Sequence, residues 1–147
     1  MESIYPEVIT TFAAVVLYGV PVAVAVLSYL LGCINGAIAT SHLFYHDDVR
    51  RHGSGNAGLT NFIRSYGAGR SAMVIAIDVG KAVLACLLGA LVFEPYGLRL
   101  EGMTLAGVCV MLGHDFPALQ GFRGGKGILC GAVGIGFNGL LLSLIHI

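Results

Sequence analysis

The fold is decided by an uncharged stretch, VITTFAAVVLYGVPVAVAVLSYLLGCINGAIATS, which occupies residues 8–41. As one helix its 34 residues would extend about 51 Å, whereas the hydrocarbon core of a bilayer is about 30 Å thick. One membrane span followed by a separate segment fits this length better. We therefore predict a span over residues 8–31 and a break or bend at residues 32–36, where Asn35 and Gly36 interrupt the apolar pattern.

The remaining apolar segments predict the rest of the architecture. Residues 71–93 and 127–147 are each long enough to cross a bilayer as a helix. Residues 102–113 number only 12, about 18 Å of helix, which predicts a half-length segment that ends inside the protein. We expect an all-α polytopic membrane helix bundle with about four hydrophobic segments, one of them short, in one integral-membrane domain over residues 1–147.

The composition excludes an ordinary soluble protein. Of the 147 residues, 56% are hydrophobic and 11% are charged, against roughly 25% charged in an average soluble domain. Eight Lys and Arg balance eight Asp and Glu, so no basic surplus points to nucleic acid. The four cysteines lie in apolar runs without the spacing of a zinc site, so we expect reduced thiols. The N-terminal MESIYPEV lacks the positive region of a signal peptide.

Positive charges predict the orientation. Loops 46–70 and 114–126 carry most of the Lys and Arg residues, whereas the opposite side has only Arg99. Because Lys and Arg favour cytoplasmic loops, we expect the N-terminus outside and both glycine-rich loops in the cytoplasm.

The first loop contains HGSGNAGLTNFIR, residues 52–64. Its glycines match the G-x-G-x-x-G of dinucleotide folds, but the preceding HDDVRRH cannot form the buried strand that this motif requires. A glycine-rich turn followed by a helix from about Leu59 would hold Asn61 and Arg64 on one helix face, which predicts a phosphate cradle. A flexible connection between spans is the alternative.

The second loop contains GGKG, residues 124–127, directly before an apolar helix predicted to begin near Ile128. It lacks the residues of a P-loop, but its small residues, Lys126 and the following helix end all favour an anion. The alternative is that Arg123 and Lys126 anchor the helix at the lipid headgroups.

Three further polar residues fall on apolar segments or at their ends. Asp78 and Lys81 lie at i and i+3 in the second span, so we expect them to face the bundle interior and either pair or contact a ligand. His114 follows the short segment and could serve as an acid, a base, a hydrogen-bond donor or a helix cap. These clusters on one predicted face suit two phosphorylated substrates, or one with several phosphates.

Several motifs carry a family resemblance: SYLLG (28–32), RHGSGNAGLTN (51–61) with Arg64, Asp78-x-x-Lys81, and GH-x4-L-x2-F-x-GGKG (113–127). In this order they resemble the bacterial acyl-phosphate:glycerol-3-phosphate acyltransferase family, PlsY. The chain departs from that family at Asn35, where proline is usual. Family members continue through further membrane segments, so we expect a member truncated at its C-terminus.

The resemblance implies transfer of a fatty acyl group from acyl phosphate to the 1-hydroxyl of glycerol 3-phosphate, giving lysophosphatidate and phosphate at the bacterial cytoplasmic membrane. It implies no metal or other cofactor, no nucleic acid, and an upstream enzyme that forms acyl phosphate. Whether His114 or a substrate phosphate accepts the hydroxyl proton stays open. A transporter or anion-binding protein with interrupted helices is the alternative function.

The expected site residues fall in two groups. The catalytic candidates are Ser54, Asn56 and His114. The candidates for binding substrate or phosphate are Gly53, Gly55, Gly58, Thr60, Asn61, Arg64, Asp78, Lys81, Gly124, Gly125, Lys126 and Gly127.

Overall fold

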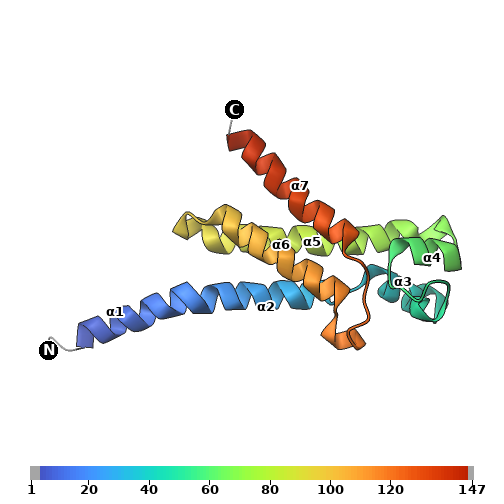
Figure 1. Cartoon of the computed structure of the whole chain (residues 1–147), viewed down its shortest axis with the longest axis horizontal. Helices are drawn as coiled ribbons and strands as arrows, with labels where there is room; N and C mark the ends of the chain where they lie inside the picture. Colours follow the sequence, from blue (N-terminus) through green and yellow to red (C-terminus); the bar gives the residue numbers. More distant parts are fainter. Residues whose placement is uncertain (1–3, 146–147) are drawn as a thin grey trace.

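The computed structural model describes residues 4–145, and the regular elements in that range are all helical (Figure 1). Its α-helices are α1 (Ile4–Ala14), α2 (Val20–Gly32), α3 (Gly36–Tyr45), α4 (Leu59–Tyr66), α5 (Ser71–Phe93), α6 (Arg99–Asp115) and α7 (Ile128–Ile145). Three helical stretches are long and apolar enough to cross a membrane: Val8–Tyr45, Ala68–Tyr96 and Arg99–Gln120. The last two residues of the predicted segment 127–147 lie outside the described residues.

The predicted break in the first apolar stretch is confirmed. Helix α1 continues through a π-helical turn, Val15–Gly19, into α2, and α2 ends at Gly32. Asn35 then adopts an extended backbone, and its side-chain oxygen accepts a hydrogen bond from Ile38 N at 3.0 Å. This N-cap satisfies a backbone donor that the first turn of α3 would otherwise leave unpaired. The chain can therefore stop one helix and start another within three residues.

Helix α6 is longer than the sequence predicted. The uncharged run of residues 102–113 forms its centre, but the helix extends over 17 residues, Arg99–Asp115. Its charged residues lie at the two ends: Arg99 and Glu101 are in the first turn, and Asp115 is the last residue. Helix ends near water tolerate such charges, so hydropathy alone underestimated the length.

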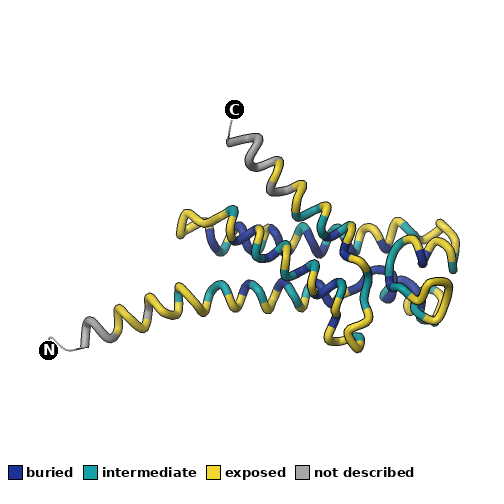
Figure 2. Tube along the Cα trace, in the orientation of Figure 1, coloured by how far each residue is buried: buried dark blue, intermediate teal, exposed yellow. Residues whose placement is uncertain are grey.

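Glycines bring α6 against two neighbouring helices. A Cβ on Gly89 of α5 would overlap the carbonyl oxygen of Gly102, and a Cβ on Gly113 would overlap that of Tyr29 in α2. Small residues at such crossings let the backbones of membrane helices approach closely. Buried side chains fill the rest of this core: Val24, Ala82, Ala85, Phe93, Ala106, Val110 and Cys130. Figure 2 shows the buried residues along these contacts and exposed residues along α1.

The two glycine-rich loops lie side by side at one end of the bundle. Both follow α-helices that end there, α3 and α6, and Ala57 N donates a hydrogen bond to Gly124 O at 3.3 Å. Helices α3 and α4 close this end over a second core that includes Phe62 and Val74. The predicted convergence of the two loops is confirmed.

Candidate active site

A cavity of about 410 Å³ opens where the two loops meet α4, α5 and the start of α7. Its walls combine polar side chains from both loops with apolar residues of α7. The lining residues are Ser54, Asn56, Gly58, Leu59, Thr60, Asn61, Arg64, Asp78, His114, Lys126, Gly127, Ile128 and Leu129.

The side chain of Asn61 organises the first loop. Its Oδ1 accepts a hydrogen bond from Ser54 N at 2.9 Å. Its Nδ2 lies 3.0 Å from the carbonyl oxygens of Val49, His52 and Asn56. Asn61 is only 3% exposed, so this amide is used by the loop itself. We expected Asn61 to bind phosphate, but its contacts fit a residue that holds Ser54 and Asn56 in place.

Helix α4 begins at Leu59, as predicted. Its N-cap, Gly58, offers no side chain to the free backbone N–H groups of the first turn, so these remain open to an anion. Arg64 lies one turn beyond Asn61 and lines the same cavity. Gly53 and Gly55 have φ values of +55° and +73°, which favour glycine, and allow the tight turn before the helix.

The second loop packs flat against the end of α6. Gly125 N donates a hydrogen bond to His114 O at 3.0 Å, and Gly124 N donates to Asp115 O at 3.2 Å. A Cβ on Gly125 would overlap Nε2 of His114. These glycines are therefore required by close packing, a reason that the sequence did not show. Lys126 is exposed and lines the cavity, and α7 begins at Ile128 as predicted.

Asp78 and Lys81 face the bundle interior, as predicted, and are 2% and 4% exposed. The Lys81 ammonium lies 3.0 Å from Asp78 Oδ1. It also donates hydrogen bonds to the carbonyl oxygens of Gly32 and Ile34, and Gly36 N donates to Asp78 Oδ1 at 3.0 Å. The pair thus supplies partners to the backbone exposed by the break between α2 and α3. Asp78 lines the cavity, whereas Lys81 is not among the residues that line it.

His114 completes this buried cluster. Its Nδ1 lies 2.8 Å from Lys81 Nζ and 3.5 Å from Asp78 Oδ1. A lysine ammonium has only donors and a carboxylate has only acceptors, so Nδ1 accepts a hydrogen bond from Lys81 in one tautomer and donates one to Asp78 in the other. The other ring nitrogen, Nε2, faces Gly125. With Nδ1 accepting, His114 offers the site a hydrogen-bond donor at Nε2, and with Nδ1 donating it offers an acceptor there.

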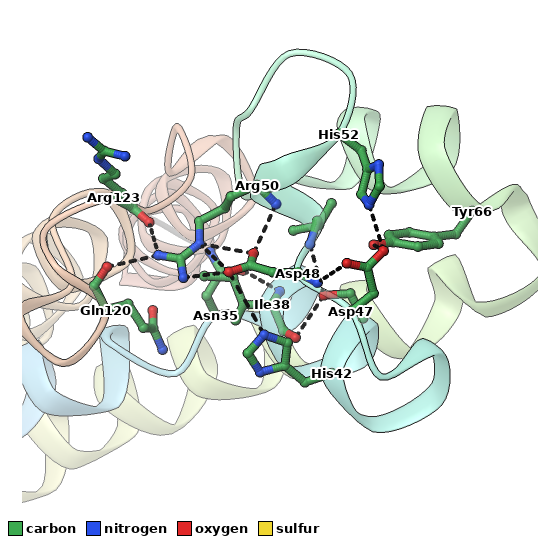
Figure 3. Close-up of polar contacts among 12 residues, drawn as sticks. Asn35, Ile38, His42, Asp47, Asp48, Arg50, His52, Tyr66, Gln120 and Arg123 are labelled. Carbon is green, nitrogen blue, oxygen red and sulfur yellow. Dashed lines mark hydrogen bonds and ion pairs between the residues drawn. The ribbon is translucent and has the colours of Figure 1, made fainter.

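Sequence reasoning missed a polar network beside the cavity (Figure 3). Both oxygens of Asp48 accept hydrogen bonds from the Arg50 guanidinium, which holds the pKa of Asp48 at about 2, below its ordinary 3.8. Burial, with a hydrogen bond to Asp47, raises the pKa of Tyr66 to about 12. The spacing Asp48-x-Arg50 just before the first loop was the available signal.

The four cysteines are free thiols, as expected. Within residues 4–145, the structure places no group of three or more His, Cys, Asp or Glu side chains that could hold a metal ion.

Comparison with known proteins gives the family. The family model described as glycerol-3-phosphate acyltransferase matches residues 22–147. A glycerol-3-phosphate acyltransferase of Thermoanaerobacter sp. (strain X514) is 43% identical over 107 residues, which cover 73% of this chain and 52% of the relative. The enzyme of that name from Clostridioides difficile (strain 630) is 41% identical over 108 residues, covering 73% and 53%. This chain therefore spans about half the length of the curated relatives it matches.

Two crystal structures share the fold. They are described as PlsY, an integral membrane glycerol 3-phosphate acyltransferase, in its glycerol 3-phosphate form and its lysophosphatidic acid form. The first has a TM-score of 0.70 and 28% identity, and the match covers 85% of this chain and 60% of that one. Fold and cavity thus define a polytopic helical membrane protein with a polar site at one end of its bundle. The chain belongs to the glycerol-3-phosphate acyltransferase family.

Proposed function

We propose that this chain carries the acyl-transfer site of a membrane enzyme that moves a fatty acyl group from acyl phosphate to the 1-hydroxyl of glycerol 3-phosphate. The observation that carries the proposal is that one cavity is lined both by Ser54 and Arg64 from one segment and by Lys126 from another. Two cationic side chains and the open start of α4 suit phosphate groups, and the apolar wall from α7 suits an acyl chain. The products are lysophosphatidate and inorganic phosphate.

The chemistry needs no covalent enzyme intermediate. The glycerol hydroxyl oxygen attacks the carbonyl carbon of acyl phosphate and forms the new ester bond, and the bond from that carbon to the phosphate oxygen breaks. Nδ1 of His114 lies closer to the Lys81 ammonium, at 2.8 Å, than to Asp78 Oδ1, at 3.5 Å, which favours the tautomer with the proton on Nε2. We therefore assign the hydroxyl proton to an oxygen of the departing phosphate. His114 then acts as a donor that orients this phosphate.

The remaining roles follow from position. Ser54, Asn56 and the backbone of residues 53–58 surround one phosphate or the developing oxyanion. Arg64 and Lys126 contact phosphate oxygens, with Thr60 at the open end of α4. Asp78 and Lys81 hold the imidazole of His114 in place, and Lys81 acts through His114 rather than on the substrate. Gly124, Gly125 and Gly127 let the second loop approach His114 and Asp115.

The same reasoning extends to location and partners. The positive charge of both loops supports a bacterial cytoplasmic membrane protein with its N-terminus outside and its site facing the cytoplasm. An enzyme that forms acyl phosphate supplies the donor, and the product passes to later steps of phospholipid synthesis.

Turnover tests the proposal. The chain is reconstituted in vesicles with palmitoyl phosphate and glycerol 3-phosphate, and lysophosphatidate and released phosphate are measured. We expect both products in equal amounts, and loss of at least about 100-fold in rate for Lys126→Ala or Ser54→Ala. Arg99→Ala, at the far end of α6, is the matched control and should retain activity. Uptake of glycerol 3-phosphate without product would favour a transporter and overturn the proposal.

A further inference from the structure

Arg50 spans the gap between the two loops that form the cavity. Its Nε and Nη2 donate to the carboxylate of Asp48 at 3.0 and 2.7 Å. Its Nη1 donates to Gln120 O at 2.8 Å and to Arg123 O at 3.3 Å (Figure 3). One edge of the guanidinium therefore binds Asp48, just before the first loop. The other edge binds the segment that leads into residues 124–127 of the second loop.

The Asp48 end of this contact is rigid. Asp48 Oδ1 also accepts a hydrogen bond from Arg50 N at 3.0 Å, which caps the short 3-10 turn Val49–Arg51. Val49 is fully buried in the core under α3 and α4. The carboxylate thus fixes both the backbone and the side chain of Arg50 on a packed element.

The other end of the Arg50 contact is a turn whose backbone adopts left-handed angles. Gly121 and Phe122 have φ values of +67° and +59°, and the left-handed region is rare for a bulky residue such as Phe122. The carbonyls that Arg50 binds, those of Gln120 and Arg123, flank these two residues on either side. Two residues later the chain reaches Gly125, whose N–H meets His114 O. Arg50 therefore secures the turn that delivers residues 124–127 to the cavity.

We propose that Arg50 is a positioning residue that fixes the first loop, residues 52–58, relative to the second loop, residues 124–127. Its kinetic consequence rests on the proposed acyl transfer, because Ser54 lies on one loop and Lys126 on the other. The guanidinium is required for its shape, since it binds a carboxylate through two nitrogens and two carbonyls through the third. A lysine has the charge but lacks this planar fork.

Hydrogen–deuterium exchange of the whole chain tests the contact directly. The variants are Arg50→Gln, Arg50→Lys and the control Arg51→Gln, whose side chain is exposed beside the same turn. We expect both Arg50 variants to speed exchange about 10-fold or more in peptides covering residues 52–58 and 121–127, with α5 and α6 unchanged. Arg51→Gln should match the unmodified protein. Unchanged loops, faster exchange throughout the bundle, or normal loops in Arg50→Lys would each overturn the proposal.

Kinetics then show whether the contact matters for the reaction. With palmitoyl phosphate and glycerol 3-phosphate, both Arg50 variants should lose about 10-fold or more in kcat/KM, and Arg51→Gln should stay within about twofold. Normal kcat/KM in the Arg50 variants would overturn the positioning role. If the unmodified chain shows no turnover, the proposed function fails, whereas the exchange experiment still decides whether Arg50 joins the loops.

Discussion

The ammonium of Lys81 lies 2.8 Å from Nδ1 of His114, and both side chains are almost completely buried between α5 and α6. This contact joins a membrane-embedded ion pair to a residue that lines the cavity. It also favours the tautomer of His114 that carries its proton on Nε2. The charged pair therefore serves both the packing of the bundle and the chemistry proposed for the site.

Removing one charge of the buried pair should cost more than removing both. Lys81→Met leaves the Asp78 carboxylate buried without its cation, and we expect a loss of about 3 to 5 kcal/mol in the free energy of unfolding. Asp78→Asn combined with Lys81→Met should recover part of that loss. Denaturant unfolding in detergent measures both variants. If the double variant is less stable than Lys81→Met, the pair does not behave as a buried ion pair.

Asn61→Asp keeps the hydrogen-bond acceptor of the Asn61 side chain and removes its donor, so it tests the two roles separately. The carboxylate can still accept from Ser54 N, but it cannot donate to the carbonyls of Val49, His52 and Asn56. We expect about 2 to 3 kcal/mol of lost stability, because buried carbonyls lose their donor and face a new charge. Thermal unfolding measures the loss, and exchange of residues 52–58 locates it.

A direct phosphate contact by Asn61 predicts a different result. In that case Asn61→Asp would weaken glycerol 3-phosphate binding while leaving exchange in residues 52–58 unchanged. Ile63→Val is a suitable control, because Ile63 is exposed on α4 and is not among the residues that line the cavity.

Gly125→Ala should disable the site through packing. The added methyl group would overlap Nε2 of His114, so either the loop or the imidazole must move. We expect about a 10-fold or greater loss in kcat/KM, since misplacing a reacting group by about 1 Å can cost about 100-fold. Gly80→Ala is the control, because a Cβ there meets nothing within 4 Å. Equal activity in the two variants would contradict this account.

Acid should weaken the fold through Asp48. Its pKa is lowered from 3.8 to about 2, chiefly by the Arg50 hydrogen bonds, so the ionised carboxylate favours the folded state. A depressed pKa gives stability that is present above pH 4 and is lost as the pH falls towards 2. We expect about 1 to 2 kcal/mol from this group, because its side chain is 16% exposed. Thermal unfolding of the unmodified protein and of Asp48→Asn, measured from pH 7 to pH 2.5, checks this.

If the stability of the unmodified protein and that of Asp48→Asn depend on pH in the same way, Asp48 makes no contribution to the loss of stability in acid. Asp48→Asn should instead be less stable at pH 7 and lose less on acidification.

Helix boundaries could be predicted where the sequence marks them. Asn35 and Gly36 interrupt an apolar run, and the helices that begin at Leu59 and Ile128 each follow a glycine-rich segment. The ends of α6 were harder to predict from the sequence, because charged residues such as Arg99 are usual in loops but are helical there.

The convergence of the two loops was predictable from charge and from the number of spans between them. The tasks of Asn61, Lys81 and Arg50 were not, because each binds backbone carbonyls of other segments. Backbone carbonyls occur at every residue, so a pattern of side chains cannot show which of them a given amide or cation will reach. Only the folded arrangement separates a residue that holds a loop from one that faces substrate.

The crossing of Gly89 over Gly102 leaves no room for a Cβ on either side. A larger residue at one position cannot be offset by a smaller one at the other, since glycine has nothing left to remove. Genetic suppressors of such a change must therefore arise elsewhere in α5 or α6 and act by letting the two helices separate. A search for revertants should recover them away from the crossing itself.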